Sequence, residues 1–188
     1  MTETQPYQVL EQFPRFELRL YPVHLVAEVE VTGTFENAGN LGFRPLVSYI
    51  GGANRSQSKV AMIEPAIQEE AGAEKIAMTA PVVQHAADEA GRYVVSFVLP
   101  HHYTLATAPE PTDPRVRLRE VPAQQAAVLR FTGRWTTKSY DEKAESLRSM
   151  LKDQGFELSG PMRFARYDPP WTPWFMRRNE VIAPVMGA

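Results

Sequence analysis

The segment Val31-Thr-Gly-Thr-Phe35 recurs 100 residues later as Phe131-Thr-Gly-Arg-Trp135. Each copy follows a pattern typical of a strand and precedes apolar residues at helical spacing. Gly33 and Gly133 are therefore predicted to occupy equivalent strand-to-helix turns, where glycine is free to adopt positive φ. The same order of strand, turn and helix recurs 100 residues later, which indicates an internal duplication of the chain.

The patterns around these turns predict a series of short strands. Alternating or continuous apolar runs indicate strands at 7–13, 16–21, 24–31, 93–99, 116–120, 125–132, 162–167 and 179–185. The first three follow one another closely, so we expect them to form a three-stranded meander.

Two helices are predicted, one in each half of the chain. Helical spacing places the first at about 35–50, before the stop signal Gly51-Gly52. Ser139 and Glu142 have the spacing of a capping box, so the second helix is expected to begin there and to end at Gly155. Neither helix can bury its apolar face alone. We therefore expect an antiparallel α+β fold in which two pseudo-symmetric sheets close on each other.

A shorter repeat lies within the first half. Lys-Val-Ala-Met-Ile-Glu-Pro-Ala-Ile-Gln at 59–68 is followed 16 residues later by Lys-Ile-Ala-Met-Thr-Ala-Pro-Val-Val-Gln at 75–84. The polar stretch between them is typical of a turn, so the two copies are predicted to form a hairpin. Met62, Met78 and Met162 occupy alternating strand positions and are expected to fill the core.

The composition limits the functional class. With 188 residues the chain suits one domain at 7–185, built of two related halves at about 7–100 and 115–185. The absence of cysteine excludes disulfides, thiolate metal sites and cysteine nucleophiles. No targeting segment or membrane-spanning apolar run is present, which predicts a cytoplasmic protein. The net charge is -2 and the basic residues are dispersed, which argues against binding of nucleic acid.

A loop rich in proline and tryptophan, at 167–180, is the least ordinary part of the chain. Its prolines remove backbone donors and hold φ, so we predict a stiff loop. The loop carries four large apolar side chains, Trp171, Trp174, Phe175 and Met176. One interpretation is that it caps the end of the sheet. The other is that it forms a wall of an apolar ligand pocket, with Arg177 and Arg178 positioned for carboxylates.

Signals for catalysis are weak. The chain has no nucleophile elbow, phosphate-binding loop, dinucleotide fingerprint or zinc-protease motif. The four histidines, His24, His85, His101 and His102, do not have the spacing of metal ligands. We therefore expect neither a metal site nor catalytic residues.

Several segments, in order, resemble the SOUL haem-binding protein family. They are Lys75-Ile-Ala-Met-Thr-Ala-Pro-Val82, Val95-Ser-Phe-Val-Leu-Pro100, Phe131-Thr-Gly133, Tyr167-Asp-Pro-Pro170 and Arg177-Arg-Asn-Glu180. The resemblance covers about residues 7 to 185. It implies a duplicated, pseudo-two-fold antiparallel β-sheet, closed like a twisted barrel and flanked by two α-helices, built from two related halves like those of gyrase-inhibitor-like effector-binding domains. It also implies non-covalent binding of haem or another tetrapyrrole between the first helix and the loop at 168–178.

The resemblance places the ligand-binding residues by position. They are Phe43, Leu46, Val47 and Ile50 of the first helix and Trp171, Trp174, Phe175 and Met176 of the loop, with Arg177 or Arg178 toward the propionates. Where a relative has been proposed to supply an axial histidine, this chain has Leu20. Bound haem is therefore expected to lack a strong protein axial ligand, and the protein would act as carrier, buffer or sensor.

Two other functions remain open at this point. One is an effector-binding module for other planar amphiphilic small molecules, which the duplicated fold would allow. The other is an enzyme acting on such a ligand, with Tyr49, Tyr167 or Glu180 as acid or base.

Overall fold

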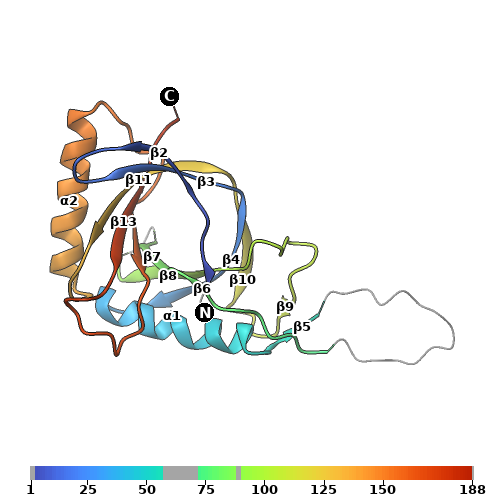
Figure 1. The fold of residues 1–188 in the computed structure, drawn as a ribbon. Helices are drawn as coiled ribbons and strands as arrows, with labels where there is room; N and C mark the ends of the chain where they lie inside the picture. Colours follow the sequence, from blue (N-terminus) through green and yellow to red (C-terminus); the bar gives the residue numbers. More distant parts are fainter. Residues whose placement is uncertain (1–2, 57–71, 88–89, 188) are drawn as a thin grey trace, which may run out of the picture.

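The computed structural model describes residues 3–56, 72–87 and 90–187. Its central element is a nine-stranded antiparallel sheet that curls into a half-barrel (Figure 1). The strands are β2 (Gln8–Gln12), β3 (Glu17–Tyr21), β4 (His24–Thr32), β7 (Val82–Ala86), β8 (Arg92–Val98), β10 (Arg117–Val121), β11 (Gln124–Phe131), β12 (Arg163–Arg166) and β13 (Asn179–Pro184). Their order across the sheet is β10-β4-β8-β7-β12-β13-β11-β3-β2.

Two helices cover the convex side of the half-barrel (Figure 1). Helix α1 (Phe35–Ile50) packs on β4, β7 and β8. Helix α2 (Thr137–Asp153) packs on β11 and β13. Each helix therefore covers a different part of the same sheet.

Two small sheets lie beside the half-barrel. β1 (Glu3–Thr4) pairs in parallel with β6 (Thr79–Ala80), and β5 (Asn54–Arg55) pairs with β9 (Glu110–Pro111). The first of these holds the N-terminal segment against the start of β7. The second extends the end of α1.

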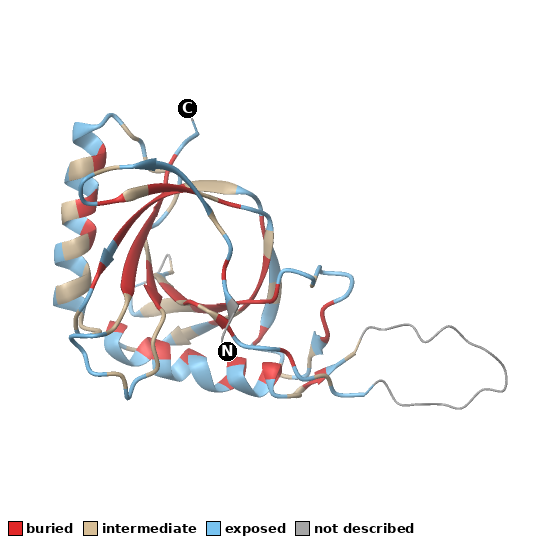
Figure 2. Cartoon of the chain, in the orientation of Figure 1, coloured by how far each residue is buried: buried red, intermediate tan, exposed pale blue. Residues whose placement is uncertain are grey.

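The core lies on both faces of the sheet. On β4, Leu25 and Ala27 belong to the cluster beneath α1, whereas Val26 packs on the concave side with Val98. Buried positions accordingly line the strands and the inner sides of the helices in Figure 2. Because side chains on both faces of the sheet are buried, the strand sequences contain continuous apolar runs. Full burial of each large apolar side chain contributes about 1.5–3 kcal/mol.

The predicted helices and most predicted strands are confirmed, but the three-stranded meander is wrong. β3 pairs with β2 and β11, whereas β4 pairs with β8 and β10. Alternation in a sequence shows that a segment is a strand but not which strand lies beside it. The hairpin expected from the repeated decapeptide falls largely outside the described residues.

The second helix begins earlier than the spacing of Ser139 and Glu142 indicated. Its N-cap is Thr136, whose hydroxyl accepts a hydrogen bond from the Ser139 backbone N–H at 3.2 Å. Thr137 donates through its backbone N–H and its hydroxyl to Glu36 of α1, at 2.8 and 2.7 Å. The Glu36 carboxylate of the other helix thus accepts from a backbone N–H that has no partner within the first turn of α2. No local motif in the sequence reveals this contact.

The two strand-to-helix turns differ in their backbone. Of the two glycines only Gly133 has a positive φ, +146°. The Gly133 backbone N–H donates to the carbonyl of Trp174, whereas that of Gly33 donates to Gly91. The barrel also differs from the expectation, because the edge strands β10 and β2 do not pair and the sheet remains a half-barrel.

Candidate ligand groove between helix α1 and the aromatic loop

A groove of about 430 Å³ lies between α1, the segment around β6 and the loop that follows β12. Its lining is mostly apolar and aromatic, with one buried guanidinium. The lining residues are Gly39, Asn40, Phe43, Met78, Ala80, Val82, Trp135, Arg166, Tyr167, Asp168, Pro169, Pro170 and Trp171. Its size falls within the range of small-molecule sites, about 300–1,000 Å³.

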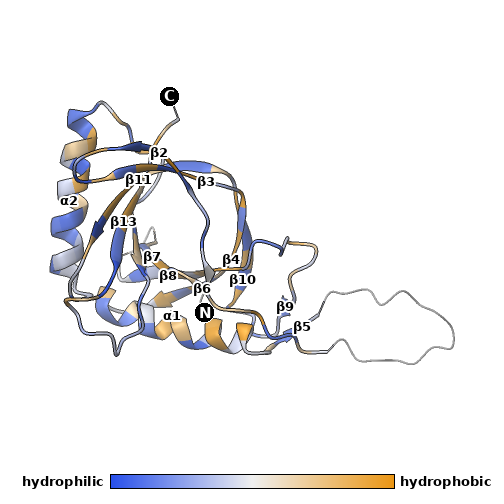
Figure 3. Cartoon of the chain, viewed as in Figure 1, coloured by the Kyte–Doolittle hydropathy of each residue, from blue (hydrophilic) through white to orange (hydrophobic). Residues whose placement is uncertain are grey.

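Two of the predicted ligand-binding residues meet in this groove. Phe43 of α1 and Trp171 of the loop both line it, and Trp171 is 82% exposed. Met78, which was expected to fill the core, is 36% exposed and lines the groove as well. α1 carries apolar residues beyond those that face the sheet (Figure 3), and Phe43 belongs to this outer set.

The remaining predicted apolar residues lie elsewhere. Leu46 and Ile50 are buried in the cluster between α1 and the sheet. Four other predicted residues are exposed and do not line the groove. They are Val47 of α1 and Trp174, Phe175 and Met176 of the loop. Leu46 and Ile50 thus serve the packing between α1 and the sheet rather than the lining of the groove.

The two predicted arginines are held by the loop itself. Arg177 donates to the carbonyls of Thr172 and Pro170, at 2.7 and 2.6 Å, and its guanidinium lies 4.2 Å from the centre of a Trp135 ring. Arg178 donates to Glu180 Oε1 through Nε and Nη2, at 3.1 and 2.7 Å. Both side chains therefore brace the loop.

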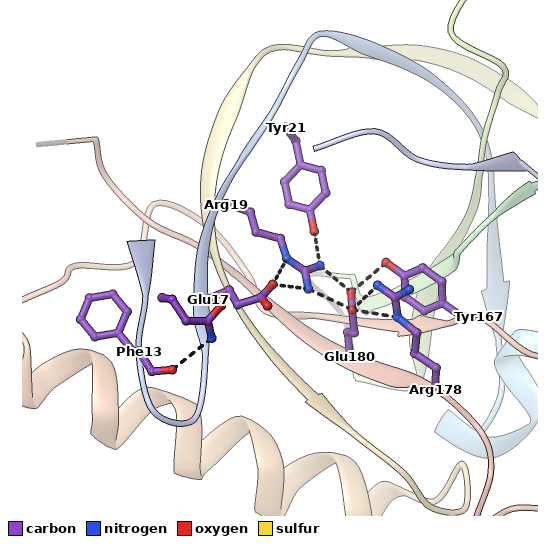
Figure 4. Close-up of polar contacts among 8 residues, drawn as sticks. Phe13, Glu17, Arg19, Tyr21, Tyr167, Arg178 and Glu180 are labelled. Carbon is purple, nitrogen blue, oxygen red and sulfur yellow. Dashed lines mark hydrogen bonds and ion pairs between the residues drawn. The ribbon is translucent and has the colours of Figure 1, made fainter. Parts of the chain in front are cut away.

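The Tyr-Asp-Pro-Pro and Arg-Arg-Asn-Glu segments bind each other at the base of the loop (Figure 4). Glu180 is fully buried and accepts from Tyr167 Oη at 2.7 Å and from Arg19 at 3.0 and 3.2 Å. Burial and the Glu180 carboxylate raise the pKa of Tyr167, which keeps its hydroxyl a donor. Asp168 Oδ2 accepts from the Arg178 backbone N–H at 2.6 Å. These contacts fix where the loop leaves and rejoins the sheet.

Asn179 connects this base to the start of α2. Its Oδ1 accepts from Trp135 Nε1 at 2.8 Å, and its Nδ2 donates to the carbonyl of Gly133 at 3.1 Å. Trp135 is in this way positioned as a wall of the groove. The motif residues at 178–180 thus shape the site without facing it.

Arg166 is the cation in the lining of the groove, and sequence reasoning missed it. It is 6% exposed and donates to Gln84 Oε1 at 3.0 Å, while its Nε has no partner. Burial, followed by the charge of Arg177, lowers the pKa of Arg166 to about 10. No carboxylate among the described residues forms an ion pair with it. A buried cation of this kind favours an anionic ligand.

The backbone of α1 makes room for Arg166 at Gly39. A β-carbon at this position would lie 2.3 Å from Arg166 Nη1, so any residue other than glycine requires the guanidinium to move. Glycine inside a helix costs about 1 kcal/mol relative to alanine. The available sequence signal was an arginine at the end of the short strand Arg163-Phe-Ala-Arg166, directly before the Tyr-Asp-Pro-Pro segment.

Histidine takes no part in the lining of the groove. Leu20, the position of the proposed axial ligand in a relative, is half-buried on β3 and does not line it either. Within 3–56, 72–87 and 90–187, no three His, Asp or Glu side chains are grouped as a metal site. No helix in these ranges is long and apolar enough to cross a membrane.

The half-barrel with its two helices defines an α+β fold, and the sequence defines the family. The model of the SOUL heme-binding protein family matches residues 2–73 and 67–184. The chain therefore belongs to this family. Heme-binding protein 1 of Xenopus laevis is 29% identical over 167 residues, which cover 88% of this chain and 81% of the relative.

Solved structures share the fold at low sequence identity. The C-terminal domain of EcmrR superposes with a TM-score of 0.65 at 14% identity, over 97% of this chain and 99% of that chain. A hydrolase from Listeria innocua superposes with a TM-score of 0.58 at 11% identity, over 94% of each chain. These similarities concern the architecture alone.

Proposed function

We propose that this protein binds haem or a related tetrapyrrole non-covalently in the groove between α1 and the aromatic loop, as a carrier, buffer or sensor. The observation that carries the proposal is an apolar, aromatic groove with a single buried cation, Arg166, that lacks a carboxylate partner. Membership of the family and the name of the Xenopus relative support the same class of ligand.

Arg166, rather than Arg177 or Arg178, is assigned the propionate contact. The other two arginines already donate to loop carbonyls or to Glu180. Arg166 retains an unpartnered Nε and lines the groove. A charge-assisted hydrogen bond at a buried site contributes about 1.5–3 kcal/mol, so this contact would supply both affinity and orientation.

Binding without catalysis is the form of the proposal that the geometry favours. The hydroxyl of Tyr49 donates to the carbonyl of Pro109 at 2.8 Å, and that of Tyr167 donates to Glu180. Glu180 accepts from two arginines as well. All three candidate acid–base residues are thus engaged in structural hydrogen bonds.

A hemin titration tests the proposal through the Soret band and tryptophan fluorescence. We expect saturable binding that weakens about tenfold or more in Arg166→Gln and in Trp171→Ala, with little change in folding stability. Trp174→Ala is the matched control, because Trp174 lies on the same loop outside the groove. Absence of a saturable Soret shift, or equal losses in both tryptophan variants, would reject the site.

Two further ligands separate the contributions of iron and carboxylate. Metal-free protoporphyrin IX should bind within about tenfold of hemin, a difference of about 1.4 kcal/mol, because no histidine lines the groove. A porphyrin without carboxylates should bind wild type and Arg166→Gln equally. Loss of the Soret band on replacing any of His24, His85, His101 or His102 with alanine would instead show axial coordination.

The proposal also includes an internal duplication within a single domain at 7–185. The sheet order supports it, because β10-β4-β8-β7 read from one edge corresponds to β3-β11-β13-β12 read from the other side. In each set of four strands the second, β4 or β11, leads into a helix. The first, β10 or β3, comes from the other half of the chain. A radius of gyration of about 16 Å is expected for the monomer.

A further inference from the structure

A second cavity lies on the concave face of the half-barrel and shares no lining residue with the groove. It measures about 30 Å³, and its walls come from eight of the nine strands. One water needs about 10–15 Å³ of such space. The cavity is therefore large enough for two or three waters, or for an anion of three or four heavy atoms.

Arg163 of β12 brings an unmatched positive charge to this cavity. Its Nε is buried without a partner, and its terminal nitrogens meet the Gln124 amide oxygen at 3.1 and 3.3 Å once that amide is turned toward them. Burial lowers the pKa of Arg163. None of the described carboxylates forms an ion pair with it. The hydrogen bonds of the Arg163 guanidinium to described residues thus go to the neutral Gln124 amide alone.

Among the described residues, the other arginines and carboxylates that are buried on this face or line the cavity are paired. Glu180 is held by Arg19 and Arg178 (Figure 4), and Arg119 forms an ion pair with Glu28 at 2.8 Å. An isolated buried charge is costly, whereas paired charges offset much of that cost. Arg163 therefore stands out as the position where a negative charge is missing.

His85 offers a second unsatisfied group in the same cavity. Its Nδ1 is buried and has no hydrogen-bond partner. His24 also lines the cavity, with its Nδ1 hydrogen-bonded to the carbonyl of Pro22 at 2.8 Å. Burial, together with the charge of Arg163, lowers the pKa of both histidines. A bound anion would oppose this effect and favour their protonated, donating forms.

We propose that this cavity is a binding site for a small monoanion of the size of formate or nitrate, held by Arg163 and His85. The cavity admits such an ion, and Arg163 supplies charge and a free Nε donor. Protonated His85 adds a second donor at Nδ1. The remaining charged and titratable groups that face the cavity are Tyr21 of β3, His24 of β4, Arg119 of β10 and its partner Glu28.

Binding should strengthen as the pH falls. Taking up the anion raises the pKa of His85 and His24, so binding is coupled to proton uptake. The affinity for formate should therefore be higher at pH 6 than at pH 8. Arg163 keeps its charge across this range, so the dependence on pH comes from the histidines.

Thermal unfolding in sodium formate tests the site, with sodium gluconate at equal ionic strength as reference because gluconate is too large for the cavity. At ten times Kd, formate should raise the Tm of wild type by about 3 °C or more. Arg163→Met should abolish this rise, and its own Tm in gluconate should be no lower than that of wild type, because an unpaired buried charge is gone.

A second variant and a surface control keep the test decisive. His85→Gln should weaken the formate response and reduce its dependence on pH. Arg148→Gln, on the exposed face of α2, should respond as wild type does. An equal rise in Arg163→Met, or no excess of formate over gluconate in wild type, would show that only waters occupy the cavity. Hemin binding should be unaffected by Arg163→Met, so the two sites can fail independently.

Discussion

The position of the Arg166 guanidinium limits the size of the residue at position 39 of α1. The guanidinium lies against α1 at a position where any β-carbon would overlap with Nη1. Within the described part of the chain its side chain hydrogen-bonds to Gln84 alone, and the Trp135 ring lies 4.8 Å from its guanidinium carbon. The charge is therefore held by shape and by one amide rather than by a carboxylate.

This arrangement predicts an unusual sign for Gly39→Ala. In most helices the change stabilises by about 1 kcal/mol, but here it should lower the free energy of unfolding because Arg166 must move. In an Arg166→Ala background the same change should stabilise, giving a coupling of about 1 kcal/mol or more in a double-mutant cycle. Ser48→Ala, exposed on the same helix, should behave alike in both backgrounds. Urea unfolding measures the free energy of unfolding of wild type, of each single variant and of the double variant. If the effects of Gly39→Ala and Arg166→Ala were additive, the contact between the two residues would be contradicted.

At the scale of elements, the two helices are tied together at their N-termini. Glu36 in the first turn of α1 accepts two hydrogen bonds from Thr137 in the first turn of α2. These hydrogen bonds lower the pKa of Glu36. The pairing places the start of α2 at Thr136, one turn before the residue that a capping motif indicates.

The observed cap predicts different effects at two neighbouring positions. Thr136→Ala should lower the free energy of unfolding by about 1 kcal/mol, because the Ser139 backbone N–H loses its acceptor. Ser139→Ala should change it by only a few tenths of a kcal/mol, since Ser139 lies within the helix. Denaturant unfolding of both variants provides the comparison. A larger loss for Ser139→Ala would restore the capping box at Ser139 and Glu142.

At the scale of the whole molecule, the half-barrel surrounds ionisable groups on its concave face while the helices cover the convex face. His24 and His85 lie there with pKa values lowered by burial and by Arg163. The folded protein therefore binds fewer protons than the unfolded chain once the pH falls below about 6.5.

Stability should accordingly decrease between pH 7 and pH 5. The unfolded histidines become protonated below about 6.5 while the folded ones remain neutral until their lower pKa is reached, so the loss grows across that interval. Thermal melts in gluconate buffer measure the effect, and His85→Gln should reduce the slope. His101→Gln provides a control outside the cavity. A slope unchanged by His85→Gln would show that other groups carry the pH dependence.

The elements were predictable because their signals are local. The helical spacing before Gly51-Gly52 placed α1, and the apolar runs placed the main strands, because side-chain periodicity reports which face of an element is buried. The loop at 167–180 was recognised from its prolines and motifs. Its position next to Phe43 followed from the family resemblance, and the groove contains both Phe43 and Trp171.

The sequence alone determined the class of fold, the family and two of the segments that form the groove, α1 and the aromatic loop, because these depend on composition, periodicity and short motifs. Only the tertiary structure decided that β3 pairs with β11, that Arg177 and Arg178 brace the loop, and that Arg166 faces the groove. Strand partners and the environment of a charge depend on residues far apart in the chain. No local pattern carries that information, because burial and pairing arise only when the sheet curls and the helices pack against it.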